Sequence, residues 1–120
     1  MNPSSSPVVE QAQALVAEKR RAGGTPQDHV ALAKALLDLS AALEQDDREA
    51  DSVAAAKESV AVLSADFLAD PPALAMPMRA SVARYVALAS RSGTPDEALL
   101  GPIAQALGDL TRIEDADDDG

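Results

Sequence analysis

Few residues in this chain have the type and spacing that support chemistry. His29 is the single histidine among 120 residues, and there is no cysteine, so a thiolate nucleophile, a disulfide and a cysteine-based metal site are excluded. No acid or nucleophile stands at a recognisable spacing from His29, which we expect at the surface in the first turn of a helix. The carboxylates fall in predicted helix turns and tails, so the sequence indicates no acid–base pair for catalysis.

Known ligand-binding motifs are missing as well. The acidic group formed by Asp46, Asp47, Glu49 and Asp51 lacks the spacing and the central glycine of an EF-hand loop. The two Gly-Thr-Pro turns, at residues 24–26 and 93–95, lack the lysine that a phosphate-binding loop requires. We therefore expect no enzymatic activity, no cofactor and no metal.

The overall charge and hydropathy argue against two classes of partner. The chain has 20 acidic and 10 basic side chains, and its net charge of −10 would be repelled by a nucleic-acid backbone. Its apolar runs are only a few residues long, far below the roughly 20 that a membrane span needs, so we expect no membrane partner. Because the polar segment 1–7 is not followed by an apolar signal core, we predict cytoplasmic localisation.

Charge is unevenly distributed along the chain. Residues 44–70 contain eight acids and two bases, whereas residues 71–95 contain three arginines and no acid. Arg84 and Arg91 are seven residues apart and therefore share one face of a predicted helix. Two interpretations stay open: this face contacts a partner, or the arginines pair with acids of the preceding helix or of the C-terminal tail.

The elements that carry these residues are predicted to be helices. The chain contains 26 alanines and 14 leucines, while Phe67 and Tyr85 are its only aromatic residues, a composition that favours helix over strand. Apolar periodicity and cap signals predict an all-α protein of five helices, at about residues 7–22, 26–44, 48–69, 77–91 and 95–110. Thr94 and Glu97 are expected to form a capping box, and Pro102 is expected to kink or split the fifth helix.

These helices are predicted to form one domain with loose ends. We expect a flexible arm at residues 1–6, a single helical domain at residues 7–112 and a disordered acidic tail at residues 113–120. The apolar faces of the helices define the predicted core, which consists of Leu32, Leu36, Leu39, Leu43, Val53, Val60, Leu63, Phe67, Val82 and Tyr85.

The helices fall into pairs. A very short loop joins the second to the third, so these must lie antiparallel, and the fourth and fifth repeat the plan as stacked antiparallel hairpins. The first pair has bulky residues at Leu36, Leu39 and Leu43 and small residues at Ser40 and, seven apart on the second helix, at Ser52 and Ser59. This segment resembles a tetratricopeptide repeat unit. A second set lies 46 residues further on, a spacing similar to extended bacterial variants of that family, at Val82, Tyr85, Val86, Ala89, Ala98 and Gln105. A plain helical bundle is the alternative fold.

The resemblance implies a function as well as a fold. It implies a non-enzymatic protein–protein interaction module, a scaffold or adaptor that binds a peptide or helix of a partner in a concave groove. In the register of that family, Lys34, Asp38, Arg84 and Arg91 face the groove. The alternative is a small regulatory or chaperone-like helical bundle that acts through an exposed apolar helix face.

The fifth predicted helix suggests an additional contact. Stacked hairpins usually need at least about three units to cover their apolar faces, and this chain offers two and a lone first helix. The fifth helix also carries more apolar residues than one inward face uses. We therefore expect its end to meet another protein, either a partner or a second copy in a homodimer, with Ile103 and Leu107 at the centre of the interface.

Overall fold

The first two helices begin at proline residues that follow a capping hydroxyl. The structure, a computed structural model, describes residues 6–118, with side chains to residue 111, so residues 1–5 of the predicted arm lie outside the described part. In α1 (Pro7–Ala22), the Ser6 hydroxyl accepts a hydrogen bond from the Val9 N–H at 3.2 Å. In α2 (Pro26–Gln45), Thr25 and Asp28 form a reciprocal capping box.

The third and fourth helices are separated by a single residue. Helix α3 spans Glu49–Ala69 and α4 spans Pro71–Ser92, so the predicted start of the fourth helix at Pro77 is wrong. Proline is tolerated in a first helical turn, where its missing N–H would have no partner, and Pro71 and Pro72 therefore begin the helix. Pro77 lies inside α4 and cannot donate to the carbonyl one turn before it.

Helix α5 (Glu97–Asp118) begins two residues after the predicted start and ends well beyond the predicted end. Its cap is Asp96, whose carboxylate accepts the Leu99 N–H at 3.2 Å, and not the predicted Thr94. Pro102 does not split α5, because it falls within the first two turns and removes one hydrogen bond from a helix that then continues. The helix runs beyond residue 112 to Asp118, through the segment predicted to be a disordered tail, since no glycine or proline interrupts the chain after Gly108 before that point.

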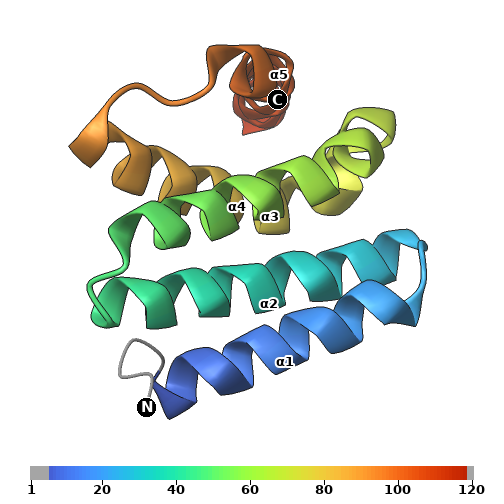
Figure 1. Cartoon of the computed structure of the whole chain (residues 1–120). Coiled ribbons are helices and arrows are strands. Elements are labelled where there is room, and N and C mark those ends of the chain that lie inside the picture. The colour runs from blue at the N-terminus through green and yellow to red at the C-terminus, as the bar shows by residue number, and fades with distance from the viewer. Residues whose placement is uncertain (1–5, 119–120) are drawn as a thin grey trace.

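The described part of the chain is all-α, as predicted, with five helices. Helices α1 to α4 follow one another as antiparallel neighbours, and α2 also contacts α4. Figure 1 shows α1 to α3 running across the view, whereas α5 is seen along its axis above the upper helices. Helix α5 therefore crosses the stack of α3 and α4, both of which it contacts, instead of lying alongside α4.

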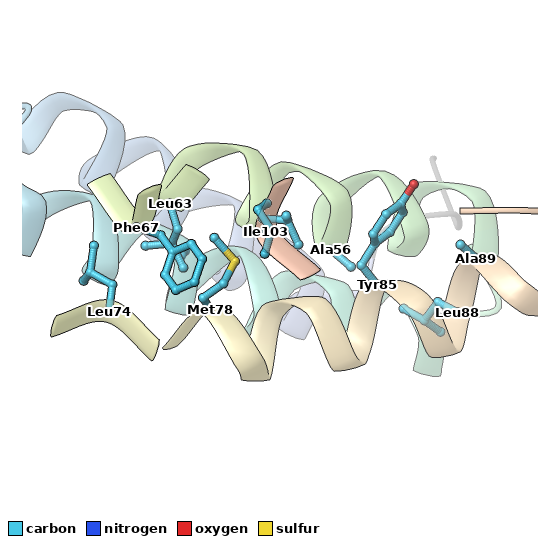
Figure 2. Packing of buried hydrophobic residues seen from close by; sticks show 11 residues of the cluster. Ala56, Leu63, Phe67, Leu74, Met78, Tyr85, Leu88, Ala89 and Ile103 are labelled. Atoms are coloured by element: carbon cyan, nitrogen blue, oxygen red, sulfur yellow. The ribbon is translucent and has the colours of Figure 1, made fainter. Parts of the chain in front are cut away.

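The main core lies between α3, α4 and α5. Figure 2 shows Leu63 and Phe67 of α3 near Met78 of α4, with Ile103 of α5 lying among the labelled side chains of both helices. Of the predicted core, Leu39, Val53 and Val82 are partly buried, and the other seven residues are buried. Ile103 is 0% exposed and Leu107 is partly buried against the same cluster, so the prediction that these two residues form an interface is wrong for Ile103.

The hairpin of α2 and α3 closes on two buried serines. Ser40 donates its hydroxyl to the Ser52 carbonyl at 2.9 Å, and Ser52 donates to the Ser40 carbonyl at 2.7 Å. Both side chains are 0% exposed. Because the two hydroxyls satisfy each other's backbone carbonyls, the helices approach closely without leaving a buried polar atom unpaired. This hairpin holds α2 in place beside α4, where the candidate site lies.

Candidate peptide-binding groove

A small apolar pocket lies between α2 and α4. Its volume is about 220 Å³, and it is lined by Val30, Ala33, Lys34, Leu37, Pro77, Ala80 and Ser81. Lys34 and Ala80 are exposed, whereas Ser81 is 0% exposed. The Ser81 hydroxyl has no hydrogen-bond partner, which makes it the one such buried side-chain oxygen among the described residues. We refer to this cavity as the serine pocket.

A larger pocket adjoins the serine pocket where α3 ends. Its volume is about 450 Å³, and it is lined by Pro26, Gln27, Val30, Asp66, Ala69, Asp70, Ala73 and Leu74. Val30 lines both pockets, so the two adjoin at this residue of α2. The lining is apolar except for Gln27 and the two carboxylates, which belong to the last turn of α3 and the residue after it. We refer to this cavity as the acidic pocket, and to the two cavities together as the groove.

His29 contributes to the acidic pocket by orienting one of its carboxylates. The His29 Nδ1 atom lies 2.5 Å from Asp66 Oδ2, and both side chains are partly buried. This contact joins the first turn of α2 to the last turns of α3. The sequence predicted a surface histidine without a partner, because 37 residues separate His29 from the acid that the fold brings to it.

At the other end of the contact between α2 and α4, ion pairs link the two helices. Arg84 Nη2 donates to Glu44 Oε1 at 2.8 Å, and Arg91 Nη1 donates to Glu44 Oε2 at 2.6 Å. Arg84 Nε also donates to the buried Ser40 hydroxyl at 2.9 Å, which links α4 to the serine pair of the hairpin. The hydrogen bond from Arg91, followed by that from Arg84, holds the pKa of Glu44 below its ordinary value.

The structure places only some of the predicted binding residues in the groove. Lys34 and Asp38 are exposed on α2, and Lys34 lines the serine pocket. Arg84 and Arg91 pair with an acid, but with Glu44 of α2 and not with an acid of α3 or of the tail, so that alternative was wrong about the partner helix. The contributions of Val30, Pro77 and Ser81 were missed. The available signal was the helical spacing of Ser81, which lies three residues after Met78 and therefore shares its buried face.

A second carboxylate fixes the start of α5. The Asp96 N–H donates to the Tyr85 hydroxyl oxygen at 2.8 Å, and the Asp96 carboxylate lies 3.2 Å from Lys57 Nζ. The Leu99 N–H and then Lys57 hold the pKa of Asp96 below its ordinary value. Asp96 thus ties α5 to both α3 and α4, outside the groove.

These two carboxylates predict the direction of the pH dependence of stability. The pKa values of Glu44 and Asp96 are lower in the folded chain than their ordinary values of 4.5 and 3.8, so the unfolded chain binds more protons in the acidic range. Stabilisation is complete above the ordinary values and is lost as pH falls through the folded ones. We expect the free energy of unfolding in urea to decrease from about pH 6 to about pH 3.

A matched pair of variants tests this assignment. Glu44→Gln should reduce the pH dependence, because the neutral amide accepts hydrogen bonds from the arginines without titrating. Glu49→Gln changes an exposed residue of the neighbouring helix and should retain the dependence of the parent. Equal slopes for Glu44→Gln and the unchanged chain would contradict the role of Glu44.

Comparisons with protein-family models, with curated proteins and with solved structures find no match for this chain. Within residues 6–118, no helix is long and apolar enough to cross a membrane. The same residues contain no cluster of three or more histidine, cysteine, aspartate or glutamate side chains that could hold a metal ion.

Proposed function

We propose that this chain is a non-enzymatic protein-interaction module that binds a peptide segment of a partner in the groove between α2 and α4. The observation that supports this most is that the two pockets adjoin at Val30, with other residues of α2 lining each of them. Binding sites are typically concave and mostly apolar, with a few polar groups that fix orientation. The groove has this composition, with Lys34, Asp66 and Asp70 as its charged groups.

The tetratricopeptide-like arrangement is part of the same proposal. Two observations support it: α2 contacts the first helix of the next predicted unit, α4, and the small positions Ser40 and Ser52 meet at the centre of the hairpin. In such an arrangement the first helices of successive hairpins line the groove; α2 and α4 correspond to these positions, although α5 crosses α4 instead of pairing alongside it.

The second candidate function is a bundle that acts through an exposed apolar face. The observation in its favour is Met76 of α4, which is 80% exposed, together with Leu68 of α3 at 43%. A partner that binds this face would be sensitive to Met76→Lys, whereas a partner in the groove would be sensitive to changes at Ala80.

A displayed library of short random peptides tests the groove directly. Ala80→Arg places a long charged side chain at the exposed edge of the serine pocket and should weaken binding of the selected peptides by at least about tenfold. Ala61→Arg makes the same change at an exposed alanine of α3 that lines neither pocket, and it should leave binding unchanged. Peptides that bind both variants equally, or no enrichment over an unrelated helical protein, would contradict the proposal.

A further inference from the structure

We infer that α1 docks on a surface that the α1 of a second copy of this chain can also occupy, so that two chains form a dimer by exchanging this helix, with Gly23 as the hinge. The surface is the face of α2 and α3 that α1 covers. No residue of α1 lines either pocket of the groove, so this inference is independent of the proposed function.

Helix α1 packs separately from the main core. Its buried side chains, Val9 and Val16, belong to two small clusters with residues of α2 and α3, whereas the main core includes no described residue of α1. Figure 1 shows α1 at the lower edge of the stack, and among the described helices only α2 brings its backbone close to that of α1. Release of α1 therefore leaves the core between α3, α4 and α5 intact.

The surface under α1 requires a cover when α1 leaves. Helix α2 stays in place, because Ser40 and Ser52 join it to α3 and because it also contacts α4. On its α1 side, Leu36 and Leu43 are only 1% and 3% exposed while α1 is docked. Exposure of such side chains to water is unfavourable, so the vacated surface favours binding of a helix with the same apolar pattern. The identical helix of a second copy supplies that pattern.

Exchange restores the polar contacts of α1 as well. Arg20, in the basic last turn of α1, pairs with Glu58 of α3, and the same pair forms when α1 comes from a second copy. A cavity of about 270 Å³ is lined by residues of all three helices, including Gln13 and Arg20 of α1, so α1 is incompletely packed and has fewer contacts to break on leaving. Exchange of an identical element between chains is a low-cost route to a dimer for this reason.

The hinge is strained for any residue other than glycine in the closed chain. Only residues 23–25 lie between α1 and α2. Gly23 has a φ of 143° and a ψ of −164°, a conformation that is essentially restricted to glycine. A Cβ at this position would lie 2.7 Å from Oδ2 of Asp28, the carboxylate of the capping box. When α1 swings away from α2 the tight turn is no longer required, and an extended conformation suits any residue.

A matched pair of hinge variants tests the exchange. Gly23→Ala strains the turn of the closed monomer but not the open linker of the dimer, whereas a Cβ at Gly24 meets nothing within 4 Å, so Gly24→Ala is the control. Each chain is refolded from urea over a series of concentrations and sized by light scattering. We expect the dissociation constant of the Gly23→Ala dimer to be at least about tenfold lower than that of Gly24→Ala. Equal constants, or monomers alone for both variants, would overturn the inference.

Crosslinking identifies the chain that supplies α1. The chain contains no cysteine, so Arg20→Cys with Glu58→Cys introduces one thiol on α1 and one on α3, at positions whose side chains meet. A short bis-maleimide adds to both thiols and joins them within one chain in the monomer but between chains in an exchanged dimer. With Gly23→Ala also present, denaturing electrophoresis should show covalent dimers whose yield rises with protein concentration. Dimers that give only intrachain products would contradict an exchange of α1.

A second matched pair separates exchange from other modes of association. Val16→Asp places a charge in the docked face of α1, and in the Gly23→Ala chain it should abolish the dimer. The adjacent Leu15 is 37% exposed, and Leu15→Asp should leave the dimer in place. Circular dichroism establishes that each variant retains its helical fold, which is expected because the main core includes no described residue of α1. A dimer that persists in the Val16→Asp variant forms through another surface, and the inference is then wrong.

Discussion

Replacing Ile103 by aspartate is expected to destabilise the protein by about 3–5 kcal/mol, because it leaves a carboxylate without a partner in a site that is 0% exposed. Ile103 is the buried side chain through which α5 enters the main core between α3 and α4. Ordinary domains have a total stability of about 5–15 kcal/mol, so a loss of this size is a large part of the whole. Urea denaturation followed by circular dichroism measures it.

The control for this substitution is Ile103→Val, which removes one methylene group and should cost about 1 kcal/mol. Light scattering at several concentrations supplies the second readout. The position of Ile103 in the core predicts that the loss of stability is independent of protein concentration. A stable Ile103→Asp variant with an altered oligomeric state would instead restore the interface that the sequence suggested for this residue.

Replacing Phe67 by alanine is expected to cost about 3–5 kcal/mol, since a large fully buried side chain is removed and a cavity remains. Phe67 packs in the cluster that joins α3 to Leu74 and Met78 of α4. The adjacent residue provides a matched control: Leu68 is 43% exposed, and Leu68→Ala should cost less than about 1 kcal/mol. Equal losses for the two variants would contradict the assignment of Phe67 to the core.

The Phe67→Ala variant is also expected to affect peptide binding in the groove. Phe67 directly follows Asp66, and the end of α3 that it anchors also carries Asp70. Loosening this end should alter the lining of the acidic pocket and weaken binding of the peptides selected for the groove, at concentrations of urea that leave the unchanged chain folded. Leu68→Ala should bind these peptides as the unchanged chain does.

Local features of the sequence were sufficient to predict the helices. Thr25, Pro26 and Asp28 form a cap from residues that are neighbours in the chain, and the leucine spacing between Leu32 and Leu43 marks the buried face of α2. The all-α class, the limits of α1 to α3 and most of the core follow from such short-range patterns, because caps and helical periodicity act within a few residues.

Only the tertiary structure decided which residues form the groove. Whether Arg84 faces a partner or an acid depends on the distance between α2 and α4, and the structure places it on Glu44, 40 residues away in sequence. The sequence predicted Ile103 to be excess apolar surface at an interface, but α5 crosses α3 and α4 and buries this side chain in the core. Helix crossing angles depend on side-chain packing across the whole core, which no local pattern encodes. The packing of α4 against α2 therefore determines that Ser81 is buried beside a pocket without a hydrogen-bond partner.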